Sequence, residues 1–190
     1  MTTPRILAFA GSLRTASFNR KLIQIGVDGA KAAGADVTLI DLRDFAIPVY
    51  DGDLEASGLP EGVLKLKTLF VEHHGLLISS PEYNGSIPGP LKNAIDWVSR
   101  MKDQPFKDKP VALQSVAGGP LGGGRVQYQW RQIMVFVEAL VFLRPEVFVG
   151  MAGQKFDEKT LEFKDEAGIN FIKQQLAGFE KFIRKVGGKA

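Results

Sequence analysis

The chain alternates short apolar runs with stretches of helical periodicity, and it does so five times in succession. The apolar runs expected as strands are residues 5–10, 35–41, 75–79, 111–116 and a run within 140–149 that Pro145 interrupts. The stretches with apolar side chains at helical spacing are residues 17–33, 61–74, 91–101, 125–139 and 169–186. Strands that alternate with helices predict an α/β fold, with a parallel sheet joined by right-handed crossovers.

The number of strands narrows this fold class. Five parallel strands with helices on both faces fit a flavodoxin-like three-layer sandwich with strand order 2-1-3-4-5. Residues 42–60 and 155–165 are polar or rich in proline and glycine, and we expect them to be surface loops. At 190 residues without internal repeats, the chain is expected to form a single domain over residues 1–190.

The loop after the first strand has the composition of an anion site. Residues 11–19 read GSLRTASFN, with three small hydroxyl residues and Arg14 before a helix. A helix start offers unpaired backbone N–H groups and a partial positive charge to an anion. No Walker lysine and no second glycine of a dinucleotide fingerprint follow, which favours a single terminal phosphate. The alternative is an ordinary helix start with Ser17 as the N-cap.

Two further unusual loops follow the third and fourth strands. Residues 80–90 place Tyr83 and Asn84 where they can face a planar ring, while we favour a structural role for Glu82 in the same loop. Residues 118–124 contain five glycines, which permit close backbone approach. The carboxyl ends of strands 1, 3 and 4 meet at one edge of the predicted sheet, so the three loops are expected to form one ligand site.

The overall composition excludes several classes of function. The chain has no cysteine, which removes thiol catalysis and disulfides, and its only histidines are the adjacent His73 and His74, so no metal site is expected. The net charge of +3 comes from dispersed basic residues, so no nucleic-acid partner is expected. The apolar runs are too short for a membrane span and no signal peptide is evident, which predicts a cytoplasmic protein.

Three motifs carry a resemblance to a known family. The segments GSLRTASFN, SPEYNGSIPGPLKNAIDW and AGGPLGGGRVQYQWRQ resemble the NADPH-dependent FMN reductase family, a flavodoxin-like group that includes bacterial chromate and quinone reductases. The similarity extends over about 180 residues, nearly the whole chain. It implies non-covalently bound FMN, with NADPH or NADH as co-substrate.

The resemblance also implies which residues bind FMN. It assigns part of the first loop to the phosphate, the second loop to the isoalloxazine and ribityl region, and the third loop to the flank of the flavin. The implied cofactor-binding residues are Gly11, Ser12, Arg14, Ser17, Phe18, Asn19, Pro81, Glu82, Tyr83, Asn84, Ser115, Gly118 and Gly119.

The implied activity is reduction of quinones, and of chromate, azo compounds or free flavin, in a ping-pong cycle. No protein side chain is expected to be catalytic, because the flavin would carry the chemistry. Arg100, Lys102 and Arg125 are candidates for attracting an anionic substrate. The alternative is a flavodoxin-type electron carrier without NAD(P)H turnover, although such carriers dock through strongly acidic surfaces and this chain is basic.

Family members form dimers and tetramers, and the sequence gives independent support for a homo-oligomer. The helix expected at 125–139 carries more large apolar side chains than one buried face requires, and aromatic residues are enriched at interface cores. Arg125, Tyr128 and Glu146 are the candidates for a polar network between subunits.

Overall fold

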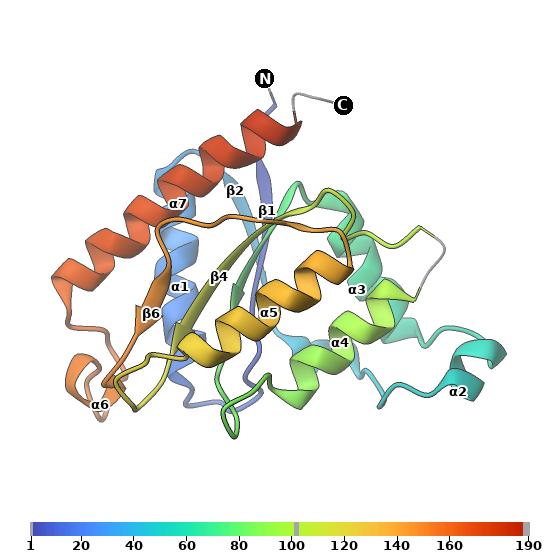
Figure 1. Cartoon of the computed structure of the whole chain (residues 1–190), viewed down its shortest axis with the longest axis horizontal. Coiled ribbons are helices and arrows are strands. Elements are labelled where there is room, and N and C mark those ends of the chain that lie inside the picture. The colour runs from blue at the N-terminus through green and yellow to red at the C-terminus, as the bar shows by residue number, and fades with distance from the viewer. Residues whose placement is uncertain (1, 101–102, 188–190) are drawn as a thin grey trace.

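The computed structural model describes residues 2–100 and 103–187 (Figure 1). Its sheet is wholly parallel, and the strand order β2-β1-β3-β4-β5 is the predicted one, with β6 also paired to β4. The strands are β1 Arg5–Ala10, β2 Asp36–Ile40, β3 Gly75–Ser79, β4 Pro110–Val116, β5 Leu140–Val141 and β6 Val147–Val149. The flavodoxin-like fold class is therefore confirmed.

The predicted fifth strand needs one correction, because it consists of two short strands, so the sheet has six. Val111 of β4 pairs with Val141 of β5, whereas Val116 pairs with Val149 of β6. The residues between β5 and β6 include Pro145. Proline has no backbone N–H to donate to a strand ladder, which accounts for the break in pairing at this point.

Five long helices follow strands or close the chain, as the periodicity predicts. They are α1 Phe18–Ala32, α3 Glu61–Glu72, α4 Gly89–Ser99, α5 Gly124–Phe136 and α7 Glu166–Gly187. The two polar stretches expected as loops contain short helices as well, namely the 3₁₀ helix η1 Leu42–Phe45, α2 Gly52–Ser57 and the end of α6 Ala152–Lys155. Asp41 and Asp51 cap η1 and α2 by accepting hydrogen bonds from the backbone, so local capping starts these turns without an apolar period.

The helices form two layers that enclose the sheet. Ile6 and Ala8 of β1 point into a core that α1 and α7 close, while Leu7 and Phe9 point into a second core beneath α3, α4 and α5. Figure 1 shows α1 and α7 on one side of the strands and α3, α4 and α5 on the other. Because each helix returns antiparallel to the strand before it, every long helix after a strand begins at the carboxyl edge of the sheet.

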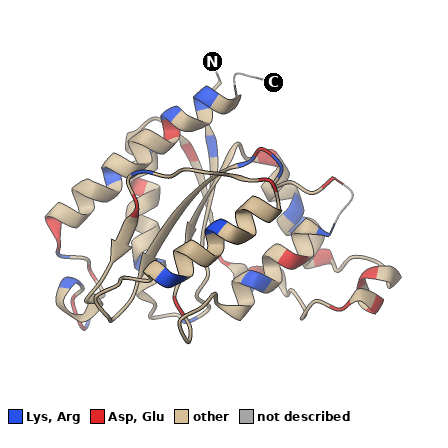
Figure 2. Cartoon of the chain, viewed as in Figure 1, with Lys and Arg blue, Asp and Glu red and all other residues tan. Residues whose placement is uncertain are grey.

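The charged residues are distributed over many elements. Figure 2 shows Lys and Arg on several helices, interspersed with Asp and Glu, and a group of acidic positions on α2. Among the helices in the described ranges, none combines the length and the apolar content that a membrane span requires.

Candidate functional site

Three loops meet at the carboxyl edge of the sheet, as the sequence predicts. We call residues 11–17 the anion loop, residues 80–88 the turn loop and residues 117–123 the glycine loop; they follow β1, β3 and β4. Backbone hydrogen bonds join their first residues to the neighbouring strands, from Gly11 N to Ser79 O at 2.9 Å and from Ser80 N to Gln114 O at 2.9 Å. In Figure 1 these loops lie together at the lower end of the strands.

The helix that follows the anion loop begins without a side-chain cap. Ser17 occupies the N-cap position with an extended backbone, but its hydroxyl makes no capping hydrogen bond, and the first turn of α1 holds no acidic residue. The alternative of an ordinary helix start capped by the Ser17 side chain is therefore not observed. A helix start without a capping side chain or a carboxylate leaves its backbone N–H groups and its partial positive charge to an anion.

The polar side chains of the anion loop divide between its inner and outer surfaces. Ser12 is buried, and its Oγ lies 3.4 Å from the N of Arg14, which donates to it, and 3.5 Å from the hydroxyl of Tyr83. The Arg14 side chain is exposed and bends back over the loop, where its Nε donates to Ala16 O at 3.0 Å. The guanidinium group of Arg14 therefore lies beside the residue that precedes the uncapped helix start.

Asn19 connects the start of α1 to two strands. Its Nδ2 donates to Val116 O at 3.1 Å, and its Oδ1 accepts from Val116 N at 3.2 Å and from the Ser79 hydroxyl at 3.0 Å. The side chain is 4% exposed. The Asn19 amide thus holds the start of α1 against the ends of β3 and β4, and the phosphate-binding role that the resemblance implies for Asn19 stays a prediction.

Phe18 and Ser115 make contacts within the protein, and their implied cofactor-binding roles stay predictions. The Phe18 ring packs against Phe156, with centroids 4.8 Å apart, at the edge of the core beneath α1. Ser115 is fully buried, and its hydroxyl donates to Gly122 O at 2.6 Å and accepts from Gln127 Nε2 at 2.8 Å. The Phe18 ring and the Ser115 hydroxyl thus stabilise the loops through contacts within the protein.

The turn loop presents Tyr83 and Asn84 on a tight hairpin. Tyr83 and Ser86 exchange two backbone hydrogen bonds of 3.0 and 2.9 Å, and Asn84 and Gly85 both have positive φ, 52° and 72°. Such a pair of residues forms the two-residue turn that Asn-Gly favours. Gln129 of α5 donates to Gly85 O at 3.1 Å, which orients the turn. The Tyr83 side chain is 44% exposed at the edge of the site.

Glu82 has the structural role that the sequence favours. One carboxylate oxygen accepts from the backbone N of Val126 at 3.2 Å, and the other accepts from Arg125 Nη1 at 3.1 Å. The carboxylate lies at the start of α5, where a negative charge complements the helix dipole. The Glu82 carboxylate is thus engaged with the start of α5, while its backbone remains part of the turn loop.

The glycines of the site differ in the space that surrounds them. A Cβ on Gly11 would lie 2.7 Å from Leu91 Cδ2, so this glycine lets β1 approach α4 and Pro81. A Cβ on Gly118 or Gly119 would have no atom of the described residues within 4 Å. The glycine loop therefore has an exposed backbone surface beside the turn loop, of the kind that a flat ring can lie against.

Of the three candidates for anion attraction, Arg125 and Arg100 lie in the described residues and occupy different places. Arg125 begins α5 at the site edge, and its side chain is 60% exposed. Arg100 follows α4, which starts at the site and extends for 11 residues, or about 16 Å at 1.5 Å per residue, toward the opposite edge of the sheet. There its guanidinium lies 5.3 Å from the centroid of the Tyr50 ring. Arg100 therefore lies away from the three loops, and its expected role in attracting an anionic substrate stays a prediction. Lys102 lies outside the described residues.

Arg125, Tyr128 and Glu146 are the candidates for polar contacts between subunits. Within the described residues they make no hydrogen bond or ion pair with one another. Glu146 pairs with Arg131 at 3.1 Å and with Arg144 at 3.0 Å, while Arg125 pairs with Glu82. Tyr128 is 56% exposed and stacks on Phe148, with ring centroids 6.5 Å apart. Tyr128 and Glu146 are brought to one side of the molecule through Arg131, whose guanidinium lies 5.8 Å from the Tyr128 ring.

The sequence reasoning missed a charged cluster next to the anion loop. Asp41, directly after β2, binds Arg20 of α1 and Arg43 of η1. The hydrogen bonds from Arg43, together with the charge of Arg20, hold the pKa of the Asp41 carboxyl far below its usual value. The signal was the charged segment Asp41-Leu42-Arg43-Asp44, which lies where the strand expected at 35–41 meets the loop expected at 42–60.

The comparisons with known proteins identify a protein family and several related reductases. Residues 4–154 match the model of a family described as NADPH-dependent FMN reductase. The chain is 39% identical over 183 residues to a quinone reductase of Escherichia coli, covering 96% of each protein. It is 36% identical over 184 residues to an NAD(P)H-dependent FMN reductase of Pseudomonas aeruginosa, covering 97% of each.

A solved structure extends the similarity to three dimensions. The flavoenzyme NAD(P)H:(acceptor) oxidoreductase FerB of Paracoccus denitrificans superposes with a TM-score of 0.83 at 29% identity. The match covers 96% of this chain and 98% of that one. The family match over residues 4–154 includes β1, β3, β4 and the three loops at their carboxyl ends.

Proposed function

The chain belongs to the NADPH-dependent FMN reductase family, and from this premise we propose that it is an FMN-dependent NAD(P)H oxidoreductase that reduces quinones. The curated relatives are quinone and FMN reductases, and FerB is a flavoenzyme. The cytoplasmic location expected from the sequence stays a prediction.

The observation that carries the proposal is the uncapped start of α1. A phosphate accepts hydrogen bonds from free backbone N–H groups and favours the positive end of a helix. Ser17 leaves this end without a side-chain cap, and the first turn adds no negative charge. We assign the phosphate of FMN to this position, with Ser12, Arg14 and Ser17 as its side-chain ligands.

The turn loop and the glycine loop fit the remainder of FMN. The exposed ring of Tyr83 and the polar Asn84 border the space beside Gly118 and Gly119, where added side-chain atoms would meet no described residue. Pro81 is buried and stabilises the turn loop against Gly11. The fit supports an isoalloxazine ring that lies against the glycine backbone, with Tyr83 and Asn84 at its border.

When bound, FMN would supply the redox chemistry between NAD(P)H and an electron acceptor. The protein residues have the tasks of binding, orientation and charge stabilisation, and no side chain of the site is assigned a catalytic acid or base. The two histidines agree with this, since His73 and His74 lie between α3 and β3 at the edge of the sheet opposite the site. Backbone N–H groups of the glycine and turn loops would stabilise negative charge that develops on the ring.

The finer proposals concern acceptors and kinetics. One face of the ring would stay open, so nicotinamide nucleotide and acceptor would use the same surface in turn, which is a ping-pong cycle. Arg125, exposed at the border of the site, would attract anions such as chromate. Azo compounds and free flavin are the other proposed acceptors, and parallel lines in double-reciprocal plots at several quinone concentrations are expected.

The decisive experiment uses the purified protein. We expect a yellow protein that releases FMN on denaturation, whose flavin absorbance is lost on anaerobic addition of NADPH or NADH and returns on addition of a quinone. A protein without flavin affinity contradicts the proposal, and bound flavin that neither nucleotide bleaches identifies an electron carrier instead. The double variant Arg14→Ala with Ser17→Ala is expected to bind FMN at least tenfold more weakly, whereas Lys65→Gln, on the outer face of α3, retains wild-type affinity.

We also propose that the outer face of α5 forms a homo-oligomer interface, in a dimer or a tetramer. Val135 is 73% exposed, Phe136 is 86% exposed and Leu143, after β5, is 64% exposed. Large apolar side chains that gather on one surface mark association sites. Arg125, Tyr128 and Glu146 lie on or beside α5 and remain the candidates for polar contacts between subunits.

A further inference from the structure

We propose that Asp41 and Arg43 are positioning residues of the anion loop, and that they make the chain prefer FMN to riboflavin. Asp41 orients Arg43, and Arg43 binds Thr15 within the loop. The loop is thereby ordered before the phosphate arrives. This inference rests on the proposed function, because it concerns how the same site recognises the phosphate.

The contacts between Asp41 and Arg43 define the orientation of the arginine. Arg43 Nε donates to both carboxylate oxygens, at 3.1 and 3.0 Å, and Nη2 donates to Oδ2 at 2.6 Å. The backbone N of Arg43 donates to Oδ1 at 3.1 Å. This forked arrangement leaves Nη1 directed away from the carboxylate, where it donates to Thr15 Oγ1 at 3.2 Å.

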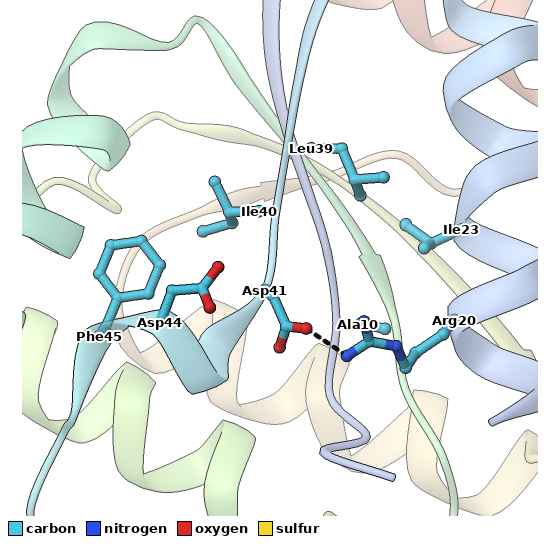
Figure 3. A pocket seen from close by; sticks show the side chains of 8 residues that line it. All are labelled: Ala10, Arg20, Ile23, Leu39, Ile40, Asp41, Asp44 and Phe45. Carbon is cyan, nitrogen blue, oxygen red and sulfur yellow. Dashed lines mark hydrogen bonds and ion pairs between the residues drawn. The ribbon is translucent and has the colours of Figure 1, made fainter. Parts of the chain in front are cut away.

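Arg20 connects Asp41 to the other side of the anion loop. Its Nη1 lies 2.5 Å from Asp41 Oδ2, and it belongs to the first turn of α1. Figure 3 shows Arg20 and Asp41 facing each other in a cavity of about 320 Å³ whose wall includes Ile40 and Phe45. Asp41 is therefore linked to both segments that flank Ser17. Arg43 links it to Thr15, and Arg20 links it to the first turn of α1.

The anion loop needs this external support. Residues 13–16 are all exposed, so packing against the core does not fix them. A loop that is disordered before binding pays its ordering entropy when the ligand binds, which weakens the affinity. Riboflavin has no phosphate and does not use the loop, so loss of this support is expected to affect FMN alone.

The test measures dissociation constants of FMN and riboflavin for the apoprotein by flavin fluorescence titration. In wild type, FMN is expected to bind at least tenfold more tightly than riboflavin. Arg43→Gln is expected to weaken FMN binding about tenfold, and Thr15→Val, which keeps the net charge and substitutes an exposed side chain, about threefold. Riboflavin affinity is expected to change less than twofold in both variants, and Lys65→Gln, which also removes one positive charge, to leave both constants unchanged.

A double variant separates orientation from charge. If Arg43 acts through Thr15, the double variant Arg43→Gln with Thr15→Val binds FMN no more weakly than Arg43→Gln alone. Additive losses, an unaffected Thr15→Val, or equal weakening of both flavins overturns the inference while wild-type binding of FMN leaves the proposed function intact. Wild-type protein that binds neither flavin contradicts the proposed function itself.

Discussion

The side-chain amide of Asn19 pairs with both backbone groups of Val116, which lies 97 residues further along the chain. Nδ2 donates to the carbonyl at 3.1 Å, and Oδ1 accepts from the N–H at 3.2 Å. The amide thus substitutes for a strand partner at the end of β4, and its Oδ1 also accepts from Ser79 at the end of β3. One residue of α1 therefore sets the position of the anion loop relative to the other two loops.

Loss of this amide is expected to destabilise the apoprotein. Asn19→Ala removes the hydrogen-bond partner of three buried groups, namely the N–H and the carbonyl of Val116 and the hydroxyl of Ser79. This loss is expected to lower the free energy of unfolding by about 3 kcal/mol. Urea denaturation followed by circular dichroism measures it. Asn170→Ala, on the exposed side of α7, is the control and is expected to change the value by less than about 0.5 kcal/mol. Equal values for both variants contradict the role assigned to Asn19.

The open surface of the glycine loop can be tested by adding one methyl group. Gly119→Ala is expected to leave the free energy of unfolding within about 0.5 kcal/mol of wild type, because no described atom lies near its Cβ position. The same methyl group would occupy the space assigned to the flavin, so FMN affinity is expected to fall at least fivefold. Gly52→Ala, which is equally open and lies on α2, should change neither quantity.

Gly122 provides the contrasting case in the same loop. Its φ is 58°, and a Cβ there would lie 2.7 Å from the backbone N of Gly150. Gly122→Ala is therefore expected to destabilise the apoprotein by about 2 kcal/mol or more, from backbone strain and overlap together. A fully stable Gly122→Ala protein would show that the glycine loop adjusts more freely than the structure indicates.

The interface proposal predicts a change in molecular mass. Light scattering is expected to show an oligomer for wild type and a smaller species for Phe136→Glu, because a charge in an apolar interface is not compensated. Arg125→Ala, Tyr128→Ala and Glu146→Ala test the polar contacts in the same way. An oligomer of unchanged mass in all four variants excludes this face, while Phe171→Glu, an exposed position on α7, serves as the control.

The stability of the fold is expected to depend on pH through His74. Burial lowers the pKa of the His74 imidazole, and the charges of Arg5, Lys109 and His73 lower it further. Its Nδ1 accepts from the backbone N of Arg5 at 2.9 Å, so the folded state requires the neutral ring. The contribution of His74 is therefore complete above its unfolded pKa of about 6.5 and is lost as the pH falls through the lower folded value.

A single substitution isolates this effect. In His74→Asn, Oδ1 can accept the same hydrogen bond but does not titrate, so the unfolding free energy should vary less between pH 7 and pH 5 than in wild type. Thermal unfolding at several pH values measures the difference. Identical pH profiles for the variant and wild type rule out His74 as the source.

Local patterns were sufficient to predict the order of the elements. The strand predicted at residues 75–79 has these same bounds in the structure, and each of the three unusual loops follows the strand that the sequence indicated. The capped turns within residues 42–57 were missed, since they depend on single aspartates and not on an apolar period.

Apolar periodicity, turn composition and short motifs are local properties that a chain displays before it folds, so they were sufficient to predict the fold class, the family and the edge of the sheet at which the three loops meet. The fold was needed to show which polar side chains of these loops already have partners within the protein. Asn19 and Ser115 have the composition of ligands, yet burial requires their polar atoms to find partners, and those partners came from strand ends and loops that only the fold brings together. The role inferred for Arg43 likewise depends on the fold, because its contact with Thr15 joins residues 28 apart in the chain.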